Sequence, residues 1–303
     1  MTPTAIFRSF TSADLPHVLQ FLGEANRLSD LCYPVHPGDF VHRLSNGLRG
    51  QNFEAHTFLY EDNGELVAVL LIEKKQPAFE VLIRHSERTP QLESDLMAWA
   101  EQTQQIRFRQ ADAALMADLM SSDELRQAML MERGYQIAAQ PYLHTTIRDL
   151  SVPIPPPALP DGFHIRSTTE ADLEQLCAVH MSAFNSSWTP DDYLRTIRTP
   201  GFDPVREIVV VAPDGQLAAF LVYWSDPVSR SGLFEPVGCA KAFQRRGLTR
   251  NLMYEGLQRM QAAGMNHAIV KHQAAEANPA SGALYRAVGF LPLFDYYEAK
   301  KLS

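Results

Sequence analysis

The chain of 303 residues carries the same succession of sequence patterns twice, once on each side of a proline-rich segment. Near the start of each copy, IFRSFTSADL from Ile6 matches HIRSTTEADL from His164, and both lead from a strand-like run to a helix N-cap candidate of the Ser/Thr-x-x-Asp/Glu kind. The segment between the copies, Asp149 to Phe163, holds five prolines within positions 153–160, which is typical of a semi-rigid spacer. The sequence therefore predicts two tandem domains, each of the usual size for one domain.

Each copy also contains a strong β-hairpin signal. Two runs rich in Val, Leu and Ile meet at Asn63-Gly64 in the first copy and at Asp214-Gly215 in the second, and such dipeptides accept the positive φ angles of tight hairpin turns. A strand with Phe-Glu, a helix, another strand, a short helix ending at glycine and a closing strand follow in both copies. The pattern predicts a mixed α/β fold with domains at 1–150 and 162–303 and a linker at 151–161.

Composition limits the classes of partner. The chain has 35 acidic and 27 basic residues, for a net charge of -8, and the acidic excess lies mostly in the first half. We expect no nucleic-acid partner, because counterion release needs a broad cationic face, whereas the acidic balance favours a cationic substrate.

The cysteines and the lengths of the apolar runs indicate where in the cell we expect the protein. Three cysteines lie far apart without CxxC spacing, which predicts neither a disulfide framework nor a zinc site and favours a reducing cytoplasm. No apolar run approaches the roughly 18 residues of a membrane span, and the start lacks the pattern of a leader, so we expect neither secretion nor a membrane partner.

A basic loop in the second copy indicates an anion site. The stretch KAFQRRGLTR, from Lys241 to Arg250, has four cations and no acid, with Gly247 in its middle. Apolar residues at helical spacing predict a helix that begins near Gly247: Leu248, Leu252, Met253, Leu257 and Met260. The first N–H groups of such a helix have no internal acceptor and its dipole end is positive. Glycine leaves the backbone open and arginines donate to phosphate, although a solvated basic helix start with an incidental glycine explains the same residues.

A second motif follows in NPASGALYRAVGF, Asn278 to Phe290, where Asn278-Pro279 opens a short helix and Gly289 ends it. Together with the loop, in this order and separation, it resembles the GNAT superfamily of acyl-CoA N-acyltransferases. The family's phosphate loop, (Gln/Arg)-x-x-Gly-x-(Gly/Ala), is similar to Gln244 to Thr249, and its later motif, Asn-x-x-Ala-x-x-Leu-Tyr-x-x-x-Gly-Phe, resembles Asn278 to Phe290. The resemblance covers residues 162–303 well and the first half in layout only. It implies two tandem GNAT-like domains, each with a mostly antiparallel central sheet flanked by helices.

The resemblance also implies how acetyl-CoA is held as the acyl-donor cosubstrate. Its pantetheine arm is expected along the strand of Val237, Gly238 and Cys239, with Asn278 in contact with the arm. Its pyrophosphate is expected on six consecutive residues: Gln244, Arg245, Arg246, Gly247, Leu248 and Thr249. Thr249 stands where the family has a smaller residue, so we expect a lower coenzyme affinity than is usual in the family.

Two residues carry the expected chemistry. The resemblance implies that Tyr285 protonates the departing thiolate, which a phenol with a pKa near 10 can do at neutral pH. The acceptor amine must first lose a proton. Glu235 is expected on the opposite face of its strand from Pro236 and Gly238, where it can point into a cleft, and it is our candidate base. His272, at the end of the next strand, is the other candidate. Each residue also has a structural explanation. Tyr285 could be only a half-buried tyrosine of its helix, and Glu235 could have a structural role, since the first copy has the same Phe-Glu pair at Phe79-Glu80.

Other candidates are less favoured. An acyl-cysteine on Cys239 lacks a histidine at nucleophile spacing, and small buried cysteines are common. The segment CYPVHPGDFVHR, from Cys32 to Arg43, has metal-type residues, but its spacing fits no familiar zinc site and its prolines indicate an ordinary loop. We therefore predict no metal.

The first copy lacks both motifs. No glycine occurs from Glu65 through Arg133, and the matching helix start carries acids, Glu87, Glu93 and Asp95, that repel phosphate. Met129-Leu130 stands in place of Leu284-Tyr285. We predict a degenerate copy that either shapes the acceptor cleft or only adds stability.

The sequence therefore predicts an N-acetyltransferase that moves an acetyl group from acetyl-CoA to a primary amine of a small molecule by direct attack. A coenzyme-binding sensor or adaptor without turnover is the alternative from another class. Within the enzyme class the tandem arrangement also resembles the mycothiol synthases, which acylate a cysteinyl pseudodisaccharide. The acceptor is expected near Ser182 to Leu194, where Trp188 and Tyr193 offer apolar surface and Asp191 and Asp192 offer charge, although an amphipathic helix with solvated acids explains these residues equally well.

Overall fold

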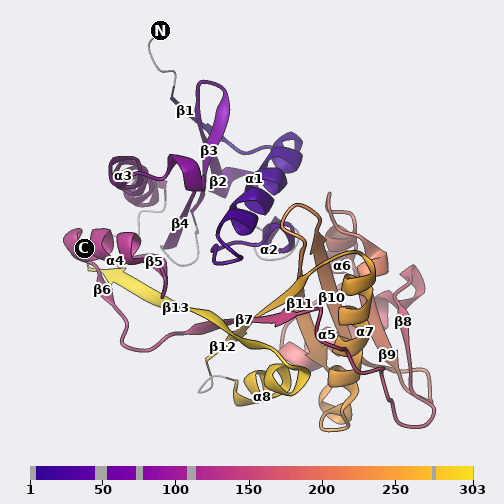
Figure 1. The fold of residues 1–303 in the computed structure, drawn as a ribbon. Coiled ribbons are helices and arrows are strands. Elements are labelled where there is room, and N and C mark those ends of the chain that lie inside the picture. The colour runs from indigo at the N-terminus through magenta and orange to yellow at the C-terminus, as the bar shows by residue number, and fades with distance from the viewer. Residues whose placement is uncertain (1–4, 45–52, 73–77, 108–113, 275–277, 303) are drawn as a thin grey trace. The chain divides into compact units, whose positions relative to one another are not determined.

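The computed structural model describes residues 5–44, 53–72, 78–107, 114–274 and 278–302, and the chain forms two compact units (Figure 1). The first unit consists of Met1–His36, Gly50–Thr145 and Leu293–Ser303, and the second consists of Pro37–Arg49 and Thr146–Pro292. The predicted mixed α/β class is confirmed. Relative to the predicted domains, residues 37–49 and 293–303 are exchanged between the units, and the bounds 1–150, 151–161 and 162–303 remain a prediction.

The first unit is a sheet with helices α1 (Leu15–Leu28), α3 (Pro90–Arg107) and α4 (Glu124–Glu132). Its strands are β1 (Ile6–Ser9), β2 (Thr57–Asp62), β3 (Glu65–Ile72), β4 (Ala78–Ile83), β5 (Leu115–Met120), the short β6 (Gln136–Ile137) and the last strand of the chain, β13 (Leu291–Lys301). Their order is β1-β2-β3-β4-β5-β13, with β6 also paired to β13. The predicted hairpin at Asn63-Gly64 joins the antiparallel β2 and β3, and both turn residues have positive φ.

The second unit holds the second copy of the pattern. Its helices are α2 (Pro37–His42), α5 (Leu173–Phe184), α6 (Pro190–Ile197), α7 (Leu248–Ala262) and α8 (Pro279–Val288). Its strands are β8 (His164–Ser167), β9 (Glu207–Val211), β10 (Leu217–Asp226), β11 (Ser231–Cys239) and β12 (His267–Gln273), in the order β12-β11-β10-β9-β8. All neighbours pair antiparallel except β11 and β12, which are parallel. The predicted hairpin at Asp214-Gly215 joins β9 and β10.

One further strand, β7 (Leu143–Asp149), passes from the first unit to the second after Thr145. Its second half lies beside β12, where Thr146 Oγ1 donates to the Val270 carbonyl at 3.2 Å and the Leu150 N–H donates to the Asn266 carbonyl at 2.8 Å. Short 3₁₀ helices occur at Ser12–Asp14, Phe53–His56, His85–Glu87, Glu170–Asp172, Pro204–Arg206 and Lys241–Phe243. Within the described ranges, every helix is too short or too polar to span a lipid bilayer.

The two copies share a device at the start of their first helices. Thr11 and Asp14 form a capping box before α1, and Thr169 and Asp172 form the same box before α5, so the predicted N-caps are confirmed. An arginine in the preceding strand pairs with the capping aspartate in each copy, Arg8 with Asp14 at 2.8 Å and Arg166 with Asp172 at 2.6 Å. The repeat seen in the sequence is therefore also a repeat of local contacts.

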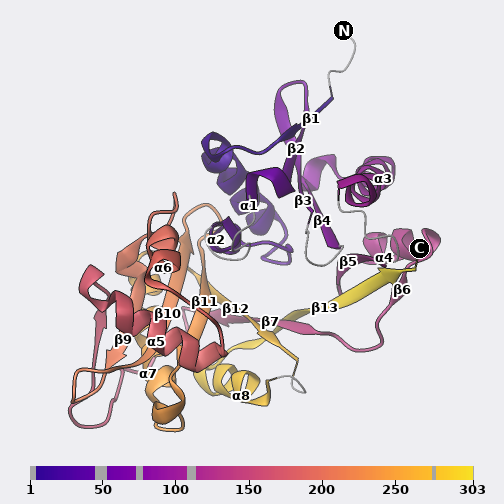
Figure 2. The ribbon, with the colours of Figure 1, turned by 180° about the vertical axis from the view of Figure 1, so that it is seen from behind.

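The core of the second unit has two layers, one on each face of the sheet. Because side chains alternate along a strand, Ile208 and Val210 face α7 while Val209 and Val211 face α5 and α6. Figure 1 shows α7 along the strands, and Figure 2, seen from behind, shows α5 and α6 beside β9 and β10. The apolar face predicted for α7 is buried over its whole length: Leu248, Leu252, Met253, Leu257 and Met260 are each exposed by 1% or less.

Candidate functional site

A cleft of about 980 Å³ opens in the second unit where β11 and β12 stop pairing. The two strands pair from Ser231–His267 to Phe234–Val270. Beyond that point both continue, to Cys239 and to Gln273, and the residues of these two ends line the cleft. The edge of β11 that faces away from β10 is thus open to the cleft over Val237, Gly238 and Cys239.

A β-bulge shapes β11 at the mouth of this cleft. On β10, Tyr223 pairs with Phe234 and Leu221 pairs with Val237, so Glu235 and Pro236 together stand opposite Val222. The indole N–H of Trp224 donates to the Glu235 carbonyl at 2.8 Å and fixes the bulge. The regular alternation on which the sequence reasoning relied is interrupted here, and Glu235 and Pro236 both line the cleft.

The loop between β11 and α7 forms the cationic end of the cleft. Gly247 is the N-cap of α7 with φ 75° and ψ 4°, a left-handed conformation that favours glycine. The residues after it begin the helix, so their N–H groups have no intrahelical acceptor. Three exposed arginines surround this helix start and line the cleft: Arg245, Arg246 and Arg250. Hydrogen-bond donors and positive charge therefore gather at one place, which suits a phosphate group.

Tyr285 lies on α8, on the other wall of the cleft, and is 7% exposed. Its ring packs against His272, with 5.3 Å between centroids, and against Phe290, with 6.1 Å. Burial raises the pKa of the Tyr285 phenol well above its usual range, and the negative charge of Glu235 raises it further. The phenol therefore keeps its proton at neutral pH. Asn278, the N-cap of α8, is exposed and lines the same cleft.

Glu235 points its carboxyl group into the cleft from the bulge. Its Oε2 atom is buried and has no hydrogen-bond partner within the described part of the chain, while Oε1 lies 3.9 Å from His42 Nε2. Burial raises the pKa of this carboxyl above its usual range, and His42 opposes the rise. A carboxylate with one unsatisfied oxygen and a raised pKa is suited to accept a proton.

His42 comes from α2, a helix that lies in the first half of the sequence and belongs to the second unit. Asp39 of α2 is 3% exposed and joins two cations, Arg43 Nε at 2.8 Å and Lys271 Nζ at 2.8 Å. Burial alone would raise the pKa of Asp39, but Arg43 and Lys271 hold it well below its usual range. Because Lys271 lies on β12 and lines the cleft, this ion pair fixes α2 beside Glu235.

The sequence reasoning missed α2. The expectation of an ordinary loop from Cys32 to Arg43 is wrong for Pro37–His42, which is helical. Proline at the first helical position and the Asp39–Arg43 pair at i,i+4 were local signals of a helix. No local signal shows that this helix packs on β10 and β11 of the other copy. Among the described residues, no group of three or more His, Cys, Asp or Glu side chains is arranged to hold a metal ion.

Comparison with protein families identifies this part of the chain. Residues 173–290 match the model of the acetyltransferase (GNAT) family, and this stretch includes β11, the arginine-rich loop and Tyr285. The chain contains a GNAT acetyltransferase domain. Every residue that the sequence assigned to the coenzyme or to the chemistry lies in this GNAT domain and lines the one cleft: Glu235, Val237, Gly238, Cys239, Gln244, Arg245, Arg246, Gly247, Leu248, Thr249, Asn278 and Tyr285.

Similar proteins extend the comparison beyond the GNAT domain. A mycothiol acetyltransferase of Thermobispora bispora is 27% identical over 185 residues, which are 57% of this chain and 61% of that protein. The match therefore spans about three-fifths of the relative's length. A GCN5-related N-acetyltransferase from Sphaerobacter thermophilus has a similar fold, with TM-score 0.66 and 18% identity over 98% of this chain and 95% of that one. A tandem GNAT protein from the clavulanic acid biosynthesis pathway gives TM-score 0.67 and 16% identity over 98% of both chains. These two likenesses concern the fold, and they confirm the predicted tandem GNAT arrangement.

The other two nucleophile or base candidates of the GNAT domain also line the cleft. His272 packs on Tyr285 and its Nδ1 lies 3.0 Å from the Gln273 carbonyl. Burial raises the pKa of the Cys239 thiol, and Thr249 only partly opposes this. A thiol that keeps its proton is a poor nucleophile, so the burial of Cys239 argues against an acyl-cysteine.

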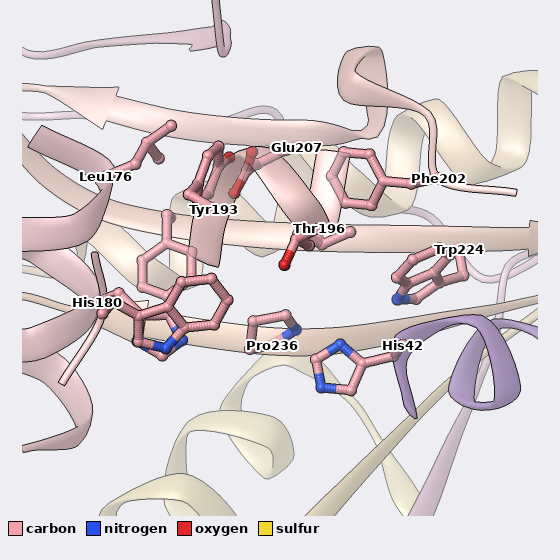
Figure 3. A pocket seen from close by; sticks show the side chains of 12 residues that line it. His42, Leu176, His180, Tyr193, Thr196, Phe202, Glu207, Trp224 and Pro236 are labelled. Carbon is pink, nitrogen blue, oxygen red and sulfur yellow. The ribbon is translucent and has the colours of Figure 1, made fainter. Parts of the chain in front are cut away.

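The residues predicted near the acceptor behave differently from one another. Trp188 and Tyr193 are buried, 5% and 9% exposed, and line a small inner cavity next to the cleft. Figure 3 shows Tyr193 in the wall of this cavity. Asp192 instead forms the capping box of α6 with Thr189 and pairs with Arg195. The structural explanation therefore accounts for Asp192, while the two aromatic residues face a cavity.

The first unit has an internal ion-pair network at the start of α3. Glu93 is fully buried and accepts hydrogen bonds from Arg88, at 2.5 Å, and from Arg126. Arg88 also pairs with Asp123 at 2.7 Å. The two arginines thus bind carboxylates of the same unit. This agrees with the prediction that the first copy has no phosphate loop at this helix start.

Proposed function

We propose that the chain is an N-acetyltransferase that moves an acetyl group from acetyl-CoA to a primary amine of a small molecule by direct attack. The observation that carries the proposal is that one cleft gathers a cationic helix start, an unsatisfied carboxyl group and a protonated phenol. The match of residues 173–290 to the acetyltransferase family supports the reaction class. The similarity to a protein named mycothiol acetyltransferase supports acetyl as the transferred group.

The residues of the cleft fit the coenzyme. A diphosphate suits the helix start at Gly247, because free N–H groups and the arginines around it donate to phosphate oxygens. The open edge of β11 at Val237 and Cys239 can hydrogen-bond an extended amide chain as a neighbouring strand would. The bound coenzyme supplies a thioester, whose carbonyl carbon accepts the amine.

The chemistry then needs two proton movements. Glu235 takes a proton from the ammonium group of the acceptor, which frees the nitrogen lone pair for attack. As the new C–N bond forms and the C–S bond breaks, Tyr285 gives its proton to the sulfur, and the second proton of the nitrogen leaves and restores the phenol. His42 lies beside the carboxyl group throughout, and its approach to Glu235 Oε1 orients the carboxyl group.

The test compares the full-length chain with Glu235→Gln in an assay of thiol release from acetyl-CoA across a panel of primary amines. We expect kcat/KM to fall by about 10²- to 10⁴-fold in the variant, because a positioned base is lost, while the Kd for acetyl-CoA stays within about threefold. In the wild type kcat/KM declines as the pH falls through the raised pKa of Glu235, and the variant lacks that decline.

Glu170→Gln is the matched control, because Glu170 is exposed on a short helix outside the cleft. It removes the same charge and should leave both quantities unchanged. Binding of acetyl-CoA without acceleration of thiol release by any amine would contradict the proposal and favour a sensor.

A further inference from the structure

A buried carboxyl group lies outside the cleft and has no role in the chemistry above. Glu207, at the start of β9, is 3% exposed and accepts a hydrogen bond from Thr168 Oγ1 at 3.3 Å. No basic side chain of the described residues pairs with it. Burial raises the pKa of Glu207 to about 8, and the charge of Asp172 adds to the rise. An unpaired carboxyl group in the interior is costly, which makes it a candidate for binding a ligand.

Glu207 lines the inner cavity together with a second incompletely bonded group (Figure 3). The hydroxyl of Tyr193 is buried and has no hydrogen-bond partner among the described residues. Aromatic rings make up much of the wall: Phe202 and Phe220, Trp188 and Trp224, and Tyr193 itself. The cavity measures about 20 Å³, enough for a guest group about the size of one water molecule.

The cavity adjoins the cleft. His42 and Pro236 line both spaces, and in Figure 3 they face Glu207 and Tyr193 across the cavity. The strand register gives the separation: Glu207 pairs with Val222 on β10, and Val222 stands opposite the bulge of Glu235 and Pro236 on β11. Neighbouring strands lie about 4.8 Å apart, so the backbones of Glu207 and Glu235 are about 10 Å apart.

We propose that this cavity seats a second ammonium group of the acceptor, so that the substrate is a small aliphatic diamine held at Glu207 by one nitrogen and acetylated at the other. The proposal rests on the proposed function, because it concerns the acceptor of that reaction. An ammonium group has about the size of a water molecule, pairs with a carboxylate, and is stabilised by aromatic faces. The net charge of -8 also attracts a dication. When the ammonium group enters, Glu207 loses its proton to solvent and the ion pair forms.

The kinetic test uses matched acceptors of three to six carbons: the monoamine, the amino alcohol and the diamine of each length. We expect the diamine of the best length to exceed the monoamine in kcat/KM by at least about tenfold, since a charged group is bonded inside the protein. In Glu207→Gln this ratio falls to within about threefold of one, and Tyr193→Phe lowers it to a smaller extent. Glu170→Gln keeps the wild-type ratio. An amino alcohol as good as the diamine, or an unchanged ratio in Glu207→Gln, overturns the proposal.

A binding experiment separates this proposal from the reaction. Calorimetry of the same diamine at pH 7, in two buffers of different ionisation enthalpy, counts the protons released. With the pKa of Glu207 at about 8, the wild type releases about one proton more per diamine bound than Glu207→Gln does. If no amine is acetylated but this release is observed, the proposed function fails and the cavity assignment stands. If the wild type binds no diamine, or releases no more protons than Glu207→Gln, the cavity assignment fails whatever the turnover.

Discussion

At the scale of single residues, burial acts on two groups of the cleft in ways that suit opposite roles. It keeps the Tyr285 phenol protonated, and it raises the pKa of the Glu235 carboxyl group above its usual range, which makes the carboxylate a better proton acceptor. The charge of Glu235 also acts on Tyr285, because it makes the phenol harder to ionise. The proposed acid and the proposed base are thus distinguished by their surroundings.

Tyr285→Phe isolates the acid. The phenyl ring fills the same space against His272 and Phe290, so the Kd for acetyl-CoA should stay within about threefold, while kcat falls by about 10²- to 10⁴-fold through the loss of the proton donor. Single-turnover thiol release at pH 7.5 measures this step. Tyr254→Phe, on α7 outside the cleft, is the control. A kcat within threefold of the wild type would mean that Tyr285 is a structural residue.

Residues with a fixed motif spacing were predictable, and residues that meet only in the fold were not. Gly247 and Tyr285 could be assigned to one site from the sequence because each lies in a motif with fixed spacing, and both line the cleft. Glu207 carries no such signal. It is a single carboxyl group before the apolar run from Ile208 to Val211, and it is enclosed only because α5 and α6 pack over β9.

At the scale of elements, α2 comes from the first half of the sequence and lies beside the cleft of the GNAT domain. It rests on β10 and β11, carries His42 to Glu235, and is held by the buried pair of Asp39 and Lys271. The sequence predicted that the first copy either shapes the cleft or adds stability. Through α2 it contributes one residue, His42, to the wall of the cleft.

Asp39→Asn tests this element. Removing the carboxylate charge of Asp39 breaks its two buried ion pairs, with Lys271 and with Arg43, which costs about 3–5 kcal/mol in the free energy of unfolding. The charge of Asp39 also raises the pKa of Glu235, while Lys271 and Arg43 lower it. The acid limb of kcat/KM should therefore move to lower pH in the variant. Chemical denaturation and the pH profile measure the two effects, with Asp161→Asn as an exposed control; a wild-type profile and stability would contradict the role of α2.

At the scale of the whole molecule, the two copies of the pattern are predictable and the exchange of segments is not. Hairpin dipeptides, capping boxes and helical periodicity act over a few residues, so they identify each copy from the sequence. The exchange involves α2 in the second unit and most of β13 in the first. Which unit a segment joins depends on which sheet edge or surface it packs against more favourably. β13, for example, pairs with β5 of the first unit over six residues. Local patterns contain no information about that choice.

The central claim is that the start of α7 binds the phosphates of acetyl-CoA. Calorimetric titration of acetyl-CoA into the wild type, Gly247→Glu and Gly264→Glu tests it most directly. Both glycines have positive φ, 75° and 84°, and Gly264 follows the other end of α7, so the two variants carry similar backbone strain and the same added charge. We predict that Gly247→Glu weakens binding by at least about 100-fold, which corresponds to about 2.7 kcal/mol, while Gly264→Glu stays within about threefold of the wild type. Equal affinity in the two variants, or no heat with the wild type, would contradict the account.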